Sequence, residues 1–253
     1  MAGAESRPRR NSAVGADLPV RLASALVMVL VAVAALWLGG WVWLGFCAAI
    51  GLGVLWEWNR IVRAFASGPV AEIAWLFGGG CYVGGATLAM VTVRNGAIFP
   101  QGGAGGYGPP EVLAGFLLPI IAVDVGAYFA GRLIGGPRIA PAISPSKTWA
   151  GLGGGAAAAS IVTLASEIAD FGPAGLYPGY SAMSLIGAVA AGVLIAVIAQ
   201  AGDFIESWMK RRAGVKDSSG LIPGHGGLFD RLDGFIAVFF VLFVVALLPA
   251  FLG

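Results

Sequence analysis

Seven long apolar runs dominate this chain, each close to the ~20 residues that a helix needs to cross a bilayer. They cover about residues 20–38, 41–58, 71–93, 111–131, 149–169, 183–202 and 234–252. Only 11% of the residues are charged, whereas a soluble domain carries about a quarter. The pattern predicts an all-α, polytopic integral membrane protein with about seven transmembrane helices. The first two runs, which are joined by Gly39-Gly40, are also compatible with one re-entrant hairpin.

The basic residues predict how the chain is oriented in the membrane. If the N-terminus lies in the cytoplasm, every Lys and Arg except Arg94 falls on the cytoplasmic side, as the positive-inside rule requires. We therefore expect a multi-pass protein of the inner, cytoplasmic membrane. Residues 1–19 would be a basic cytoplasmic tail, and residues 20–253 a single transmembrane domain. The segments 94–110 and 170–182 would be outer loops.

The densest charge in the chain lies between the last two apolar runs. Residues 203–233 hold five carboxylates, five Lys or Arg residues and the only His of the protein. Charge beside a bilayer is costly unless it is paired or binds a charged partner. Acids, bases and glycines in one segment are typical of a site for a metal-bound phosphate.

Two pairs of acids in this segment predict a magnesium site. Four residues share one face of a predicted helix because they repeat at i, i+3, i+4 and i+7: Asp203, Glu206, Ser207 and Lys210. Asp230 and Asp233 are three apart at the start of the last run, so two acidic helix ends can face each other. Carboxylate oxygens are the ligands that Mg²⁺ takes beside substrate phosphates. Alternatively, these acids cap helices or pair with the neighbouring Lys and Arg side chains.

A tight loop separates the two acidic ends. Residues 220–227 contain four glycines and one proline, so the backbone can approach a ligand closely. The N–H groups of Gly226 and Gly227 are candidates to bind phosphate oxygens, although a plain turn has the same composition. His225 is a candidate catalytic residue or, alternatively, a packing and hydrogen-bonding residue.

A second cytoplasmic segment, residues 132–148, precedes the fifth run and ends in Ser144-Pro-Ser-Lys147-Thr148. Ser146 or Thr148 would cap the following helix. Lys147 beside that helix start suggests an anion bound between them, although a lysine flanking a membrane helix is the plainer reading. Asp124 lies within the fourth run, where a lone carboxylate needs a cation or a metal, so it is a candidate third acidic element.

The motifs resemble those of the phosphatidate cytidylyltransferase family, also called CDP-diacylglycerol synthases. The main resemblance is the spaced run from Ser207 through Lys216-Asp217 and Ile222-Pro-Gly-His-Gly-Gly227 to Asp230-Arg231-x-Asp233. Residues 124–132 and 144–148, the early Arg21 and the run Trp56-Glu57-Trp58 also match. Ala150 stands where the family usually has Glu.

The resemblance implies that CTP and phosphatidic acid react to give CDP-diacylglycerol and pyrophosphate, with Mg²⁺ and a second cation beside it. Asp203 and Asp230 are the implied metal ligands, and Asp124 and Asp233 are further candidates. Residues 20–253 would then be the catalytic domain. The expected partners are CTP, phosphatidic acid and the bilayer; no nucleic acid is expected, and a homodimer is one option.

Attack of one phosphate on another needs alignment and charge neutralisation rather than a protein nucleophile. The expected catalytic residues are Asp203, Asp230, Lys210, Arg231 and His225. The expected substrate-binding residues are Ser144, Lys147, Thr148, Arg211, Lys216, Asp217, Gly226 and Gly227. The alternative is a CTP-dependent lipid or polyprenol kinase, whose hydroxyl acceptor would need a general base.

Overall fold

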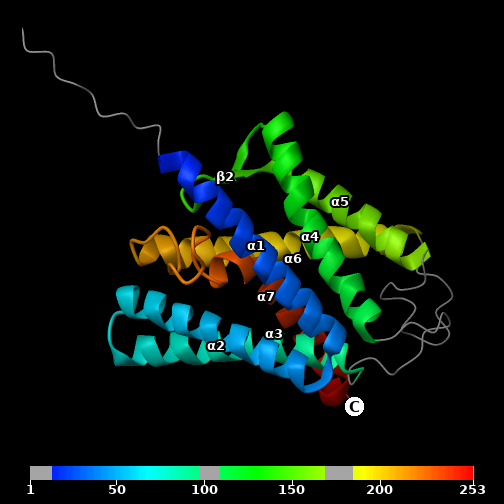
Figure 1. Ribbon diagram of the computed structural model, residues 1–253, viewed down its shortest axis with the longest axis horizontal. Coiled ribbons are helices and arrows are strands. Elements are labelled where there is room, and N and C mark those ends of the chain that lie inside the picture. Colours follow the sequence, from blue (N-terminus) through cyan, green and yellow to red (C-terminus); the bar gives the residue numbers. More distant parts are fainter. Residues whose placement is uncertain (1–12, 97–108, 169–184, 253) are drawn as a thin grey trace, which may run out of the picture.

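Seven long helices and one short β-hairpin form the part of the chain described by this computed structural model, residues 13–96, 109–168 and 185–252 (Figure 1). The helices are α1 (Ala13–Leu38), α2 (Gly40–Phe65), α3 (Pro69–Arg94), α4 (Pro109–Leu133), α5 (Trp149–Ile168), α6 (Leu185–Arg212) and α7 (Phe229–Leu252). Each is long and apolar enough to cross a membrane. The predicted all-α, polytopic membrane fold is confirmed.

The first two apolar runs form two separate helices of 26 residues each, and each is long and apolar enough to cross a membrane by itself. The chain turns between them at Gly39 and Gly40, which both have positive φ angles, of 62° and 51°. Such angles suit glycine because it has no Cβ. Two other helices extend beyond the predicted runs. Helix α6 continues to Arg212 and α7 begins at Phe229, so eight of the ten Asp, Glu, Lys and Arg residues of segment 203–233 lie in helices.

The hairpin between α4 and α5 was not predicted. Strands β1 (Arg138–Ala140) and β2 (Ser144–Thr148) pair antiparallel, with Ala140 opposite Ser144. Helix α4 ends at Leu133, and just after it Gly135 and Gly136 have φ angles of 66° and 98°, which turn the chain away from the helix. The hairpin therefore carries residues 144–148 away from the end of α4, so that they lie across α6.

Small residues let the helices around the site approach closely. A Cβ at Gly126 of α4 would lie 2.7 Å from the Cβ of Ala158 in α5. A Cβ at Gly202 of α6 would lie 2.6 Å from the carbonyl oxygen of Asp233 in α7. Close contact between backbones is the usual basis of helix association in membranes. At Gly202 this contact also brings the start of α7 against the part of α6 that carries the acids.

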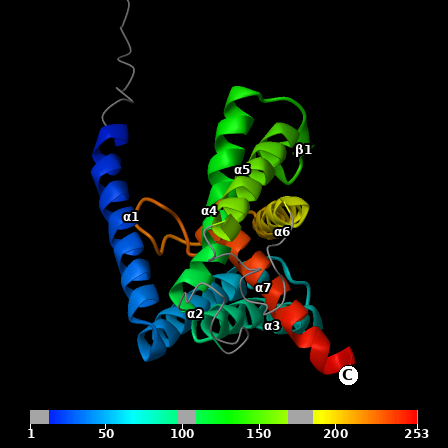
Figure 2. The same cartoon turned by 90° about the vertical axis from the view of Figure 1, so that its right-hand side faces the viewer.

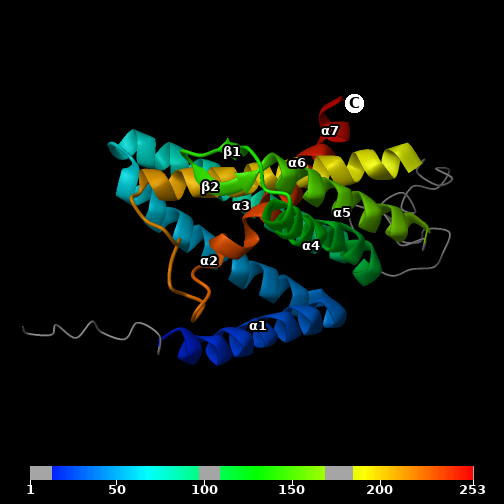
Figure 3. The same cartoon turned by 90° about the horizontal axis from the view of Figure 1, so that it is seen from above.

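The connections gather at two opposite ends of the molecule. Figure 3 shows the beginning of α1, the α2–α3 connection and the α6–α7 loop toward the left, with the α1–α2 connection and the beginnings of α4 and α6 toward the right. The predicted basic tail lies mostly outside the described residues, as do most of the two predicted outer loops.

Helix α1 lies at the edge of the bundle, packed on α2 (Figure 2). The α6–α7 loop, residues 213–228, reaches across to it. The Ser24 hydroxyl oxygen of α1 lies 3.3 Å from the Pro223 carbonyl oxygen and 3.0 Å from His225 Nδ1. The loop is therefore held at its tip by a helix that is distant in sequence.

Candidate active site

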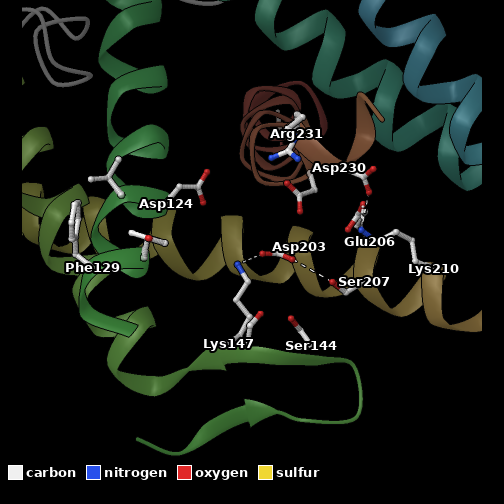
Figure 4. A pocket seen from close by; sticks show the side chains of 14 residues that line it. Asp124, Phe129, Ser144, Lys147, Asp203, Glu206, Ser207, Lys210, Asp230 and Arg231 are labelled. Atoms are coloured by element: carbon white, nitrogen blue, oxygen red, sulfur yellow. Dashed lines mark hydrogen bonds and ion pairs between the residues drawn. The ribbon is translucent and has the colours of Figure 1, made fainter. Parts of the chain in front are cut away.

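A cavity of about 660 Å³ lies where α4, β2, α6 and α7 meet (Figure 4). Its wall contains eight of the residues that were predicted to bind metal or substrate or to act in catalysis: Asp124, Ser144, Lys147, Asp203, Lys210, Asp230, Arg231 and Asp233. They come from segments far apart in the chain. The structure thus brings both predicted cytoplasmic segments, and Asp124 from the fourth run, into one site.

The predicted polar face of α6 is confirmed. Asp203, Glu206, Ser207 and Lys210 lie along one side of this helix, and all four line the cavity. The Ser207 hydroxyl donates a hydrogen bond of 3.4 Å to Asp203 Oδ1. Lys210 Nζ lies 2.7 Å from Glu206 Oε1, one helical turn away. The i, i+3, i+4, i+7 spacing therefore predicted the side of the helix that bears the site.

Three carboxylates meet closely enough to bind one metal ion. Oxygens of Asp203, Glu206 and Asp233 lie within 4.8 Å of one another. Glu206 is buried, and the other two are half-buried. Three hard oxygen donors beside a cavity fit Mg²⁺, which completes its coordination with water or substrate phosphate. The acids of α6 and α7 do face each other, as the sequence predicted.

Asp230 is hydrogen-bonded differently from these three acids. Its Oδ1 lies 2.8 Å from Lys210 Nζ, and its Oδ2 accepts hydrogen bonds from the backbone N–H groups of Gly227, at 2.8 Å, and Ser218, at 3.0 Å. Asp230 thus ties the loop to α7 while one edge still lines the cavity. Its pairing with Asp203 as a metal ligand stays a prediction.

The β-hairpin brings a cation to the acids. Lys147 of β2 forms an ion pair with Asp203 of α6, and Figure 4 shows its side chain pointing from the strand to that carboxylate. Arg211 holds the hairpin in place, because its Nε donates a hydrogen bond of 3.3 Å to the Ile143 carbonyl. Thr148 caps α5, with its Oγ1 accepting a hydrogen bond of 3.0 Å from the Gly151 N–H. Neither Arg211 nor Thr148 lines the cavity.

The glycine loop uses several of its backbone groups for hydrogen bonds within the protein. The Gly227 N–H is already donated to Asp230, and the Gly226 carbonyl accepts a hydrogen bond of 2.8 Å from Ile222 N–H. Five loop residues were predicted to act at the site but do not line the cavity: Lys216, Asp217, His225, Gly226 and Gly227. Their roles in binding or catalysis stay predictions. Arg231 lines the cavity and donates to the His225 carbonyl at 2.6 Å.

The sequence did not single out Glu57 of α2 as a functional residue, although its environment makes it one of the most connected side chains. It is fully buried. Both of its oxygens face donors of the α6–α7 loop and the first residue of α7: Ser218, Ser219, Leu228 and Phe229. A lone acid inside an apolar run was the available signal, because such an acid needs a partner.

Comparison with known proteins agrees with the motifs. Residues 109–248 match the model of the cytidylyltransferase family. A protein of Brucella melitensis named phosphatidate cytidylyltransferase is 33% identical over 90% of this chain and 93% of its own length. Proteins of the same name from Haemophilus influenzae and Pseudomonas aeruginosa are 44% and 40% identical over 46% and 45% of this chain. These two alignments cover 38% and 39% of those relatives.

Proposed function

The chain belongs to the cytidylyltransferase family, and from this premise we propose that it is a phosphatidate cytidylyltransferase. In this reaction a phosphate oxygen of phosphatidic acid attacks the α-phosphorus of CTP. The bond from that phosphorus to the bridging oxygen breaks, and pyrophosphate leaves. The product is CDP-diacylglycerol, a lipid used in phospholipid synthesis.

One observation carries this proposal. The cavity combines carboxylates on α6 and α7 with cations on three different segments, namely Lys147, Lys210 and Arg231. Such a wall suits a substrate with several phosphates, because the cations neutralise its charge and the acids suit a bound divalent ion. Val125, Tyr128 and Phe129 of α4 line the same cavity, so an apolar surface lies beside the charged one. A lipid phosphate presents the same two chemistries.

We propose Mg²⁺ as the cofactor, held by Asp203, Glu206 and Asp233. When bound, it would neutralise charge on the phosphate oxygens and orient the α-phosphorus. Asp230 and Asp124 also line the cavity and are the acids available to a second cation. The Asp203–Lys147 ion pair would then rearrange as the nucleotide enters, with Lys147 transferred from the carboxylate to a phosphate.

The remaining chemistry requires positioning and not a strong base. A lipid phosphate is largely ionised near neutral pH, so its oxygen can attack without a protein group to remove a proton. Lys147, Lys210 and Arg231 would hold the two phosphate groups in line. The absence of the only His from the described wall of the cavity is compatible with this mechanism.

We propose that the N-terminus and the site lie on the cytoplasmic side. The α2–α3 connection and the α6–α7 loop lie at the same end as the beginning of α1 (Figure 3). Seven basic residues lie in or directly beside these three segments: Arg21, Arg60, Arg63, Lys210, Arg211, Arg212 and Lys216. This is the arrangement that the positive-inside rule requires. It also gives a soluble nucleotide access to a lipid that stays in the bilayer.

The test is an assay of the purified, full-length protein with CTP, phosphatidate vesicles and Mg²⁺. CTP labelled in the cytidine should give a labelled lipid, and CTP labelled in the γ-phosphate should give labelled pyrophosphate. Transfer of the γ-label to diacylglycerol or a polyprenol would instead support a lipid kinase and contradict the proposal.

A further inference from the structure

A chain of polar contacts connects Glu57, which is outside the cavity, to the acids and the lysine inside it. Glu57 lies in α2, and its side chain is fully buried. Oε1 accepts hydrogen bonds from the Ser219 hydroxyl and, at 2.9 Å, from the Leu228 N–H. Oε2 accepts one of 2.6 Å from the Phe229 N–H and lies 3.1 Å from Ser218 Oγ. Its partners surround the point where the loop becomes α7.

Ser218 extends this chain to the site. Its hydroxyl oxygen lies 3.0 Å from Asp230 Oδ2 as well as 3.1 Å from Glu57 Oε2, so it stands between the two carboxylates. The single hydroxyl proton serves one carboxylate at a time, while the Ser218 N–H donates to Asp230 at 3.0 Å. Asp230 in turn binds Lys210, which contacts Glu206, one of the three carboxylates of the candidate metal site.

Gly227 fits the same arrangement. A Cβ at this residue would lie 2.5 Å from Glu57 Oε1 and still closer to the Ser218 hydroxyl oxygen. The buried carboxylate therefore occupies the space that any other side chain at position 227 would need. The Gly227 N–H donates its hydrogen bond to Asp230. The shape of the loop here follows from Glu57 as well as from the loop's own composition.

We propose that Glu57 is a positioning residue that aims Asp230 and Lys210 at the cavity. It fixes the first turn of α7 through the Leu228 and Phe229 N–H groups, and it fixes Ser218 beside Asp230. Groups that orient the residues around a metal typically cost about 10- to 100-fold in metal affinity or activity when they are removed. The inference deepens the proposed function and rests on it.

The main variant is Glu57→Gln. A glutamine amide presents one oxygen and one NH₂ group, so either the Leu228 or the Phe229 N–H would face a donor. We expect turnover about 10- to 100-fold lower and a Mg²⁺ concentration for half-maximal activity about 10-fold higher. The half-saturation value does not depend on how much protein is folded. Glu57→Asp, which keeps both acceptors, should recover part of the loss.

Ser218 and Ser219 provide a matched pair. Both are buried, and both hydroxyls contact Glu57, but only Ser218 also reaches Asp230. Ser218→Ala should shift the Mg²⁺ requirement in the same direction as Glu57→Gln. Because both residues act through the same contacts, the shift in the double variant should be smaller than the sum of the two single shifts. Ser219→Ala should shift it much less. Glu72→Gln, at a partly exposed ion pair with Arg63, is the unaffected control.

Hydrogen exchange gives a readout that needs no activity. The amides of Leu228 and Phe229 should exchange faster in Glu57→Gln than in the wild-type protein or Glu72→Gln. The inference is overturned if Glu57→Gln keeps its Mg²⁺ requirement and its amide protection, or if Ser219→Ala matches Ser218→Ala. Should Glu57→Gln fail to fold, an unchanged Mg²⁺ requirement in Ser218→Ala would overturn it equally. If the wild-type protein makes no CDP-diacylglycerol, the proposed function fails. The exchange experiment then still tests whether Glu57 protects the Leu228 and Phe229 amides.

Discussion

Lys147 of β2 is ion-paired with Asp203 of α6, which joins two motifs more than fifty residues apart in the chain at the wall of one cavity. The contact places a cation directly against one carboxylate of the candidate metal site. The site is therefore assembled by a hairpin between α4 and α5 and not by the last two helices alone.

Replacing Lys147 with Ala should weaken the use of CTP. Loss of the cation removes a phosphate contact and leaves Asp203 without its partner, so we expect kcat/KM for CTP to fall by about 10- to 100-fold, the effect of a lost charge-assisted contact of about 1.5–3 kcal/mol. Arg138→Ala, at an exposed residue of the paired strand, is the control. Steady-state kinetics with both substrates varied would measure this. Unchanged kcat and KM would make Lys147 a simple flanking lysine.

The cluster of Asp203, Glu206 and Asp233 predicts that activity depends on a divalent metal ion. Asp203→Asn and Asp233→Asn each remove one negative charge from this cluster while keeping the shape of the side chain. Activity should therefore fall by about 100-fold or more, as for other electrostatic contributions to catalysis. Chelation should abolish wild-type activity, and added Mg²⁺ should restore it. Asp230→Asn tests the ligand pair implied by the family resemblance. Near-normal activity in both Asp203→Asn and Asp233→Asn would remove this metal site.

The close contact at Gly202 predicts a steric effect on the site. Gly202→Ala would place a Cβ 2.6 Å from the Asp233 carbonyl and push α7 away from α6. Overpacking of this kind costs about 1–3 kcal/mol and would separate Asp233 from Asp203. We expect lower thermal stability together with a raised Mg²⁺ requirement. In Gly153→Ala, where the described part of the chain leaves space around the new Cβ, both values should stay close to wild type.

His225 can be tested as a structural contact. Its Nδ1 lies 3.0 Å from the Ser24 hydroxyl of α1, and it does not line the cavity. If its role is to hold the loop against α1, Ser24→Ala and His225→Gln should have similar, modest effects on turnover, and the double variant should be no worse than either single one. A loss of activity confined to His225→Gln would support the catalytic role that the sequence suggested. Parallel turnover measurements on the three variants decide between these roles.

Arg94 is the one basic residue that the predicted topology does not place on the cytoplasmic side, and its side chain has a structural role. Its guanidinium donates to the Leu36 and Trp37 carbonyls, at 2.7 and 3.2 Å, and so satisfies the end of α1. Arg94→Ala should therefore lower the free energy of unfolding by about 1.5–3 kcal/mol, with little change in turnover. Arg63→Ala, which breaks an exposed ion pair of 3.2 Å, should cost less than about 1 kcal/mol. Thermal unfolding in detergent compares the two.

Much of this arrangement could be predicted because its signals are local. The length of each apolar run identified the helices, and the spacing of Asp203, Glu206 and Lys210 identified the face of α6 that lines the cavity. The position of Asp233 opposite that face followed from its place at the start of the next helix. Periodicity and length therefore account for the bundle and for one wall of the site.

The rest depends on contacts between distant residues, which a single sequence does not reveal. The strands β1 and β2 have only three and five residues, and prolines lie beside them at 137 and 141 and within β2 at 145, so they lack the alternation that would predict them. Glu57 could be noticed as an acid in an apolar run, but its partners lie more than 160 residues away. The hydrogen bonds from Gly227 and Ser218 to Asp230 likewise depend on how the loop folds back.

Gly227 has no room for a side chain because Glu57 and Ser218 already fill that space. We therefore expect substitutions at positions 57, 218 and 227 to be coupled, although these positions are far apart along the chain. In a randomised library, an acceptable change at one of them should survive mainly when the other two change in compensation. Engineering the lipid or nucleotide preference of this enzyme would best leave these three positions untouched and vary the wall formed by α4.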